Sequence, residues 1–377
     1  MEFLSYIPGS WYSPIYNYLV FGLCLIMVLR NITAEDNQLI YQKVTLPVPA
    51  LALSLILIIF LGMRPEHQLW MFGDSFIYQH TYNNIVTGYT EANTETEWIF
   101  RNLMFFCKSI GLDINGFFVV VDAFYFGLML FCCWKLFPNN TWIAFLFFIS
   151  SFSCYSFAIN GIRNGLATSM LLFAIALISD DDYKKYIAFG IMLLALGVHR
   201  STILPSAACI ASIYVLKEPK YAIGFWVASI FISLIMGNAV GDFFASLGFD
   251  DRMSSYFQGQ QDAETMSEFS DTGFRFDFLL YSAMPVLMAW YVTVKRNFKD
   301  RAFNIIANTY ILANAFWVMV IRAAFSNRFA YLSWFIYPLV IAYPLLRMNI
   351  WEDQDRKTAW ILLAYSGFTF FMFLIGK

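Results

Sequence analysis

The chain has 377 residues, of which 59% are hydrophobic and only 13% are charged, and its formal net charge is −2. A soluble protein has about half its residues apolar and about a quarter charged, because its surface needs polar cover. The composition therefore excludes a soluble enzyme, a disordered tail and a basic nucleic-acid binder, and it predicts an all-α, polytopic integral membrane protein.

Apolar runs close to the roughly 20 residues that cross a bilayer as a helix recur along the chain. We predict about 12 transmembrane helices in a single domain over residues 1–377. Two of the runs are short enough to be half-helices that meet at His199-Arg200. The twelve predicted spans are Ile15–Leu29, Val44–Met63, Phe117–Leu136, Thr141–Phe157, Gly161–Ile178, Tyr186–Val198, Thr202–Leu216, Tyr221–Val240, Phe276–Val294, Phe303–Ile321, Phe329–Leu346 and Ala359–Ile375.

The basic residues predict the orientation of these spans. Twelve spans place both termini on one side, and with the termini outside, the inner loops hold 14 of the 24 Lys and Arg residues. Nine of these 14 are lysine, whereas eight of the ten outer residues are arginine. Because the planar guanidinium fork holds phosphate in a fixed geometry, an outer face rich in arginine predicts an anionic ligand there.

Two long segments, residues 64–116 and 241–275, are predicted to be extracytoplasmic loops that form the substrate site. Both are acidic and rich in aromatic residues, with Glu97 and Trp98 in the first and Asp250-Asp251 in the second. Aromatic faces stack on sugar rings, and carboxylates accept hydroxyl protons. The composition is therefore typical of sugar binding, and the alternative is a belt of interfacial aromatic residues with solubilising charge.

The first loop contains the sequence Gly-Asp-Ser-Phe-Ile-Tyr at residues 73–78. Asp74 is placed to cap the start of a helix, and Tyr78 lies on the same helical face four residues later. Asp74 is either a base or sugar ligand with Tyr78 beside it, or a simple cap.

The fifth span begins with Asn-Gly-Ile-Arg-Asn-Gly at residues 160–165. Arg163 then lies at the positive end of a helix, where unpaired N–H groups and a guanidinium can bind an anion together, with Asn164 beside it. The alternative for Arg163 is a structural arginine that extends to the membrane interface.

His199 and Arg200 lie between the two short spans, so their polar side chains are expected below the membrane surface, where burying a polar group costs free energy. The positive charge of Arg200 would favour neutral His199, as a general base requires. The alternative is a capped turn between helices.

Spans ten and eleven are joined by a segment with two arginines, Arg322 and Arg328, and no acidic residue between them. Tyr331 shares a helical face with Arg328. The pair predicts a phosphate clamp, against the alternative of two interfacial arginines.

One carboxylate is predicted to be buried within a span. Asp122 belongs either to a proton path or to a pair with a polar side chain of another helix.

In this order, the motifs resemble those of the EpsG/Wzy-type bacterial polysaccharide polymerases. The resemblance covers Arg64 to Tyr331 and rests on Gly-Asp-x-x-x-Tyr, Arg-Asn-Gly-Leu-Ala, Gly-x-His-x-Ser and the final arginine pair with its tyrosine. The family often has glutamine at the position of Asn164. The resemblance implies a GT-C-like membrane glycosyltransferase of exopolysaccharide, capsule or O-antigen assembly in the bacterial cytoplasmic membrane.

The resemblance also implies a reaction and its participants. A growing glycan on polyprenyl diphosphate would be transferred to a lipid-linked repeat unit at the outer face, with a flippase and a chain-length regulator as protein partners. Arginines would stabilise the diphosphate, so that neither a metal nor another cofactor is expected. The diphosphate is assigned to Arg163, Arg200, Arg322 and Arg328; Asp74, Glu97 and His199 are candidate bases, and Tyr78, Asn164 and Tyr331 contact substrate.

Three other functions compete with this one. A flippase for lipid-linked oligosaccharides would have similar spans and a cationic cavity, but its two halves should resemble each other, and the sequence has no internal repeat. A glycosyltransferase with a polyprenyl-phosphate sugar donor would favour a metal at Asp250-Asp251. A membrane acyltransferase could use His199, but its acyl donor is cytoplasmic.

Overall fold

A computed structural model describes residues 7–33, 47–85, 97–180, 182–236, 239, 274–322 and 326–376. The regular structure in these ranges is helical throughout, which confirms the predicted all-α class. The chain divides into two compact units, unit 1 with Met1–His199 and Leu345–Lys377, and unit 2 with Arg200–Pro344.

The chain is a polytopic membrane protein by the length and apolarity of its helices. Within the described ranges, eight helices are long and apolar enough to cross a membrane, or nine if the bent pair Val48–Gly62 and Glu66–Phe72 forms one span. The count of twelve is not confirmed. The predicted span Thr141–Phe157 is interrupted at Ser150–Ser153, where two short helices meet. The 14-residue helix over the predicted span Tyr186–Val198 is only about 21 Å long, too short for a bilayer core of about 30 Å.

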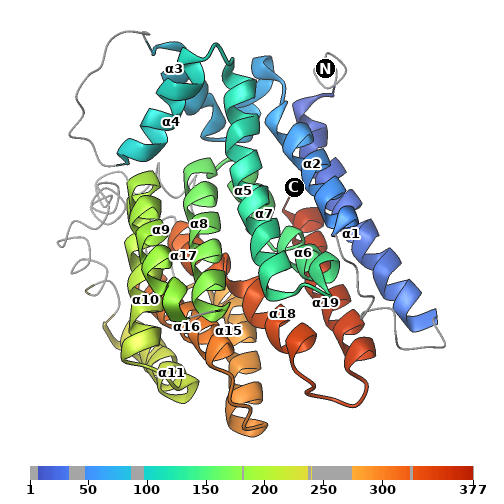
Figure 1. Cartoon of the computed structure of the whole chain (residues 1–377), viewed down its shortest axis with the longest axis vertical. Helices are drawn as coiled ribbons and strands as arrows, with labels where there is room; N and C mark the ends of the chain where they lie inside the picture. Colours follow the sequence, from blue (N-terminus) through green and yellow to red (C-terminus); the bar gives the residue numbers. More distant parts are fainter. Residues whose placement is uncertain are drawn as a thin grey trace. The chain divides into compact units, whose positions relative to one another are not determined.

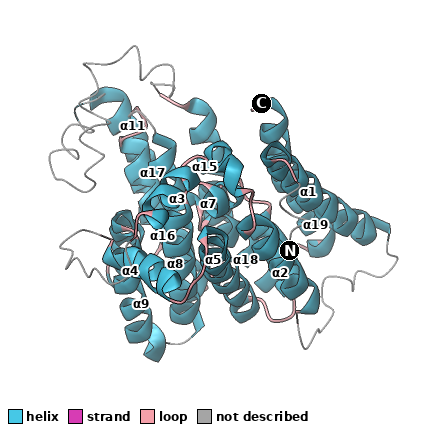
Figure 2. Ribbon diagram, turned by 90° about the horizontal axis from the view of Figure 1, so that it is seen from above, coloured by secondary structure: helices cyan, strands magenta, loops and turns pink. Residues whose placement is uncertain are grey.

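In unit 1, three helices pack side by side in the order α5, α8, α9, and α2 packs on the other side of α5 (Figure 1). Helices α1 and α19 run antiparallel, with Phe21 and Phe370 stacked at 4.4 Å between ring centroids (Figure 2). The elements of unit 1 are α1 (Gly9–Thr33), α2 (Val48–Gly62), η2 (Glu66–Phe72), α3 (Ser75–Asn83), α4 (Trp98–Ser109), α5 (Ile114–Leu136), α6 (Thr141–Ile149), α7 (Cys154–Ile159), α8 (Ile162–Asp180), η3 (Asp182–Lys184), α9 (Lys185–Val198) and α19 (Gln354–Ile375), with the end of α18 (Tyr337–Arg347).

Unit 2 is built around α16, which contacts α10, α11, α15 and α17. Asn314 of α16 is fully buried, accepts a hydrogen bond from Trp226 Nε1 at 2.7 Å and donates to Ser333 Oγ at 2.9 Å. Such bonds satisfy polar groups among apolar helices. The elements of unit 2 are η4 (Arg200–Thr202), α10 (Ile203–Tyr214), α11 (Pro219–Met236), α15 (Phe276–Trp290), η6 (Tyr291–Lys295), α16 (Arg301–Met319), α17 (Ser326–Trp334) and most of α18.

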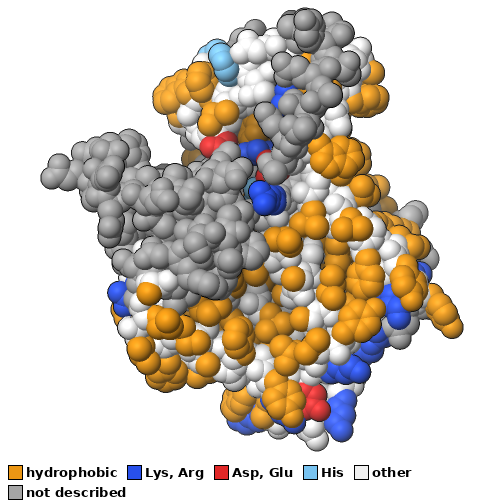
Figure 3. Space-filling model, turned by 90° about the vertical axis from the view of Figure 1, so that its left-hand side faces the viewer, with side chains coloured by type: hydrophobic (Ala, Val, Ile, Leu, Met, Phe, Trp, Pro, Cys, Tyr) orange, Lys and Arg blue, Asp and Glu red, His pale blue; other side chains and the backbone are white. Residues whose placement is uncertain are grey.

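The surface fits a lipid environment. Figure 3 shows a face on which hydrophobic side chains cover broad areas and Lys and Arg side chains are confined to a few places. Such extensive exposed apolar surface is rare on soluble monomers and is the rule where lipid replaces water.

The segment predicted as the first outer loop is largely helical in its described part. The chain bends by 101° between α2 and η2, and α3 and α4 follow before α5 begins. Figure 1 shows α3 and α4 at the end of unit 1 where α5 and α8 begin and α9 ends. The fold thus brings the described part of residues 64–116 to the start of α8, which carries Arg163, and to the end of α9, which His199 follows.

Candidate functional site

Four side chains predicted from separate motifs meet in unit 1. Arg163, in the first turn of α8, donates from Nε to the hydroxyl of Tyr78 in α3 at 2.9 Å. Nη1 of the same guanidinium forms a short ion pair with Oε2 of Glu97. The other carboxylate oxygen, Oε1, lies 2.5 Å from Nδ1 of His199, the residue that follows α9. Tyr78, Arg163, Glu97 and His199 therefore form one continuous chain of polar contacts, called here the Glu97 cluster.

The Glu97 cluster is half-buried and carries opposite charges in contact. The side chains of Arg163, Glu97 and His199 are 22%, 17% and 19% exposed, so a ligand can reach them while the surrounding protein limits access to water. An ionised carboxylate only accepts hydrogen bonds, so Nδ1 of His199 carries the hydrogen of this contact. In its neutral form, His199 then has its lone pair on Nε2, which is the arrangement of a carboxylate-oriented general base.

Glu97 reaches this position through an unusual backbone conformation. It has φ 73° and ψ 31°, in the left-handed region that non-glycine residues rarely adopt. It occupies the N-cap position of α4, but its side chain makes no capping hydrogen bond and instead contacts Arg163 and His199. Strained backbone of this kind is kept where the contacts of a site require it.

A glycine explains how α4 approaches the end of α9. A Cβ on Gly197 would lie 2.6 Å from Cδ1 of Ile99, closer than real side chains come. The absence of a side chain at Gly197 therefore lets the first turn of α4, and Glu97 with it, lie against His199. This is the physical role of the glycine in the Gly-x-His motif.

A second close approach fixes the start of α3. Gly73 has φ 59°, and a Cβ there would collide with Oδ1 of Asn160. The same Asn160 oxygen accepts a hydrogen bond from the backbone N–H of Asp74 at 2.8 Å. The Gly-Asp motif thus packs on the residue that leads into α8. Asp74 lies at the N-cap position as predicted, although its side chain makes no capping hydrogen bond.

Burial and neighbouring charges set the ionisation of Tyr78. Burial raises the pKa of Tyr78 above its usual value, and the adjacent Arg163 guanidinium opposes this effect. The negative charges of Asp74 and then Glu97 also raise the pKa of Tyr78, which places both carboxylates within electrostatic range of the phenol. Tyr78 is therefore a neutral hydroxyl that orients Arg163, not an anionic base.

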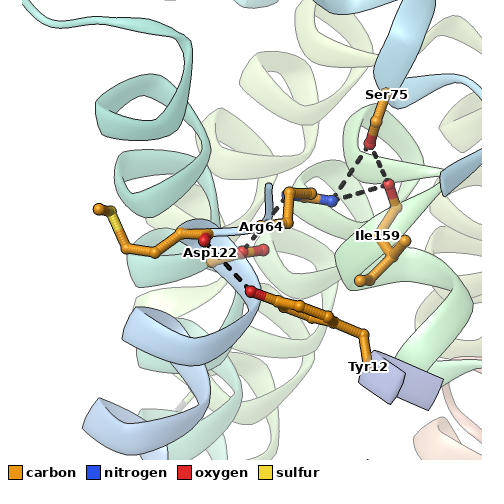
Figure 4. Close-up of polar contacts among 6 residues, drawn as sticks. Tyr12, Arg64, Ser75, Asp122 and Ile159 are labelled. Atoms are coloured by element: carbon orange, nitrogen blue, oxygen red, sulfur yellow. Dashed lines mark hydrogen bonds and ion pairs between the residues drawn. The ribbon is translucent and has the colours of Figure 1, made fainter. Parts of the chain in front are cut away.

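The buried carboxylate Asp122 is paired with another helix segment. Its Oδ2 lies 3.6 Å from Nη2 of Arg64, and both side chains are almost completely buried (Figure 4). Of the two interpretations of Asp122, the structure supports the pair. The guanidinium of Arg64 lies inside unit 1 and is not exposed to a ligand.

The remaining predicted residues lie beside or outside this cluster. Asn164 follows Arg163 in α8. Arg200 is the first residue of unit 2, which also contains Arg322, Arg328 and Tyr331. The ring of Tyr331 packs edge-on against Trp334 at 5.5 Å. The side chain of Arg328 and residues 241–273, with Asp250-Asp251, lie outside the described residues, so the roles assigned to these unit 2 residues stay predictions.

The sequence-based reasoning missed the residues that hold the site together. Asn160 was noted only as part of a motif, while Gly73, Ser75 and Gly197 received no role. Their signal is that Gly73 and Ser75 flank Asp74 and that Gly197 lies two residues before His199. In the part of the chain that the structure describes, no group of three His, Cys, Asp or Glu residues could hold a metal ion.

Comparisons with known proteins give one result. A family model described as the EpsG family matches residues 50–376, which is most of the chain and includes all four residues of the Glu97 cluster. No curated protein and no solved structure matches.

Proposed function

Because the chain belongs to the EpsG family, we propose that it is a polysaccharide polymerase that moves a growing glycan from polyprenyl diphosphate onto a lipid-linked repeat unit. Family membership supports a polymerase-like role in general. The donor, the acceptor, the outer face of the bacterial cytoplasmic membrane and the extracytoplasmic termini are parts of the proposal.

The observation that carries the proposal is the contact of Glu97 with both His199 and Arg163. A histidine oriented by a carboxylate is suited to take a proton from a hydroxyl. A guanidinium beside it is suited to stabilise negative charge on a leaving diphosphate. A glycosyl transfer from a diphosphate needs both functions within one site.

The proposed reaction is a direct displacement at the anomeric carbon. The acceptor hydroxyl of the repeat unit attacks the anomeric carbon of the donor glycan and forms the new glycosidic C–O bond. His199 takes the hydroxyl proton on Nε2 while Glu97 stabilises the resulting imidazolium. The bond between the anomeric carbon and the diphosphate oxygen breaks, and polyprenyl diphosphate leaves with both electrons. Attack from the side opposite the leaving group inverts the anomeric centre.

Arginine supplies the positive charge in this proposal. Arg163 is held by Tyr78 and Glu97 and contacts the departing diphosphate, and Arg200, Arg322 and Arg328 are assigned to the same group. A low-pKa leaving group needs charge stabilisation more than it needs a proton, so we expect polymerisation to continue in the presence of a chelator. A strict metal requirement would instead favour a site at Asp250-Asp251.

Mass spectrometry of lipid-linked sugars from a deletion strain tests the function. The proposal expects complete single repeat units on polyprenyl diphosphate, accessible to a label added outside the cell. Complete units confined to the inside would indicate a flippase. Units short by one sugar would indicate a glycosyltransferase that acts earlier in assembly.

A further inference from the structure

The strongest feature of unit 1 outside the Glu97 cluster is a charged pair inside the protein. Arg64 lies at the bend between α2 and η2, and Asp122 lies in α5; their side chains are 0% and 1% exposed. The guanidinium also lies over the ring of Phe118, 4.0 Å from its centroid. Charges at this depth are expensive, and such pairs are kept where they hold a specific arrangement.

The guanidinium of Arg64 joins two further segments. Nη1 donates to the carbonyl oxygen of Ile159 at 2.9 Å and to the hydroxyl of Ser75 at 3.2 Å. Ser75 Oγ in turn donates to the same carbonyl oxygen at 2.5 Å. Figure 4 shows Arg64 between Asp122 on one side and Ser75 and Ile159 on the other. One side chain thus links the start of α3 to the end of α7.

Both linked segments lead directly into the proposed site. Ser75 follows Asp74 and begins the helix that carries Tyr78, while Ile159 precedes Asn160 and the turn that carries Arg163. The hydrogen bond from Asp74 N–H to Asn160 Oδ1 joins the same two segments one residue further along. The contact of Tyr78 with Arg163 closes this arrangement at its far end.

We propose that Arg64, held by Asp122, is a positioning residue that sets the register between α3 and the start of α8, and so fixes the Arg163 guanidinium for the diphosphate. The role rests on the proposed function. Arg64 acts through Ser75 and Ile159 and does not touch substrate. Loss of its hydrogen bonds shifts Tyr78 relative to Arg163 without removing either group.

Two variants test this role in purified protein reconstituted in vesicles with the lipid-linked repeat unit. Ser75→Ala removes the hydroxyl link and keeps the ion pair. The double variant R64M/D122L removes both charges together, because a single charge left buried would endanger folding. Ser229→Ala is the matched control, since Ser229 is also a fully buried serine and its hydroxyl donates to the carbonyl oxygen of Trp226 at 2.7 Å within α11 of unit 2.

We expect kcat to fall roughly tenfold in Ser75→Ala and about a hundredfold in R64M/D122L, because small displacements of a reacting group are costly. The KM for the lipid-linked unit should stay within about twofold, since the binding groups remain present. Ser229→Ala should keep the wild-type kcat, and all variants should reach wild-type levels in the membrane.

A double-mutant cycle separates positioning from general stability. If Ser75 acts through Tyr78, the loss of kcat in the double variant Ser75→Ala/Tyr78→Phe is smaller than the product of the two single losses. If the two residues act independently, the loss in the double variant equals that product. The positioning role of Arg64 would be overturned if folded Ser75→Ala and R64M/D122L kept the wild-type kcat, or if the losses of Ser75→Ala and Tyr78→Phe multiplied in the double variant. Either result would leave the proposed function standing. A wild-type protein that forms no polymer in this assay would overturn the proposed function, and this role with it.

Discussion

Oε1 of Glu97 lies 2.5 Å from Nδ1 of His199, although the two residues are 102 positions apart in the sequence. The contact depends on a left-handed residue at the start of α4 and on a glycine two residues before the histidine. Because the opposite carboxylate oxygen binds Arg163, the proton acceptor and the cation of the proposed reaction share one acidic residue.

Removal of the Glu97 charge should disable the site. We expect Glu97→Gln to lower the polymerisation rate by about 10²- to 10⁴-fold, the range typical of positioned acid–base groups, because neither His199 nor Arg163 keeps its carboxylate. Polymer formed by membrane vesicles measures the effect. Glu66→Gln, which removes a carboxylate of η2 outside the cluster, is the control and should keep wild-type activity. Near-normal activity in Glu97→Gln would remove Glu97 from the mechanism.

Arg163 should not tolerate replacement by lysine. Its Nε and Nη1 atoms bind Tyr78 and Glu97 separately, and a single ammonium cannot reproduce both directions and also face a diphosphate. We expect Arg163→Lys to lose at least about a hundredfold in kcat/KM, and Arg328→Lys to be similarly inactive. Arg356→Lys, at an exposed position of α19, serves as the control. Full activity of either lysine variant would exclude that residue from diphosphate binding.

Replacement of Tyr78 should lower the polymerisation rate without changing how that rate depends on pH. Burial raises the pKa of Tyr78 above its usual value near 10, so its hydroxyl stays protonated throughout the neutral and mildly alkaline range. Tyr78→Phe removes a hydrogen bond to a charged group and should lower kcat roughly tenfold. Both limbs of the pH–rate profile should keep their wild-type positions. Loss of the alkaline limb in this variant would show that Tyr78 itself titrates during the reaction.

Two glycines of α9 provide a matched test of how α4 reaches His199. A Cβ on Gly197 would collide with Ile99, whereas a Cβ on Gly190 of the same helix meets no atom within 4 Å. Gly197→Ala should push α4 away at a cost of about 1–3 kcal/mol and reduce activity, and Gly190→Ala should be neutral or stabilising. Thermal unfolding in detergent measures the change in stability, and the yield of polymer measures the change in activity. Equal behaviour of the two variants would contradict the close packing of α4 on α9.

The sequence predicted the chemical groups of the site better than their assembly. The glycine and asparagine residues around Arg163 favour a guanidinium that is open to a ligand, and the two short spans that meet at His199 favour a polar site there. A structural role is the alternative for both residues. Glu97 stood among several acidic residues, and its contact with both others arises from tertiary packing that no local pattern encodes. The charge of Arg64 by itself favours an exposed position, whereas pairing with Asp122 makes its burial possible.

Tertiary contacts that no local pattern encodes also explain why hydropathy alone does not give the number of spans. Hydropathy detects apolar length, so it predicts one continuous span where α6 and α7 are separate short helices. It also includes α9 among the twelve spans, although the short apolar run there is the length of a half-helix. Helix α6 ends just before Ser150–Ser153, and α7 begins just after it, although the residues on both sides are apolar enough for one continuous helix. Helix bends and breaks depend on contacts with other segments, as at the 101° bend beside Arg64.

Reconstitution with defined substrates tests whether the protein forms glycosidic bonds between repeat units. Purified protein in vesicles would receive a repeat unit on polyprenyl diphosphate, and both the length of the lipid-linked glycan and the released polyprenyl diphosphate would be measured over time. The account predicts glycans that grow by whole repeat units, one polyprenyl diphosphate released for each linkage, and neither product with the Glu97→Gln variant. Movement of intact units across the bilayer without any new glycosidic bond would contradict it.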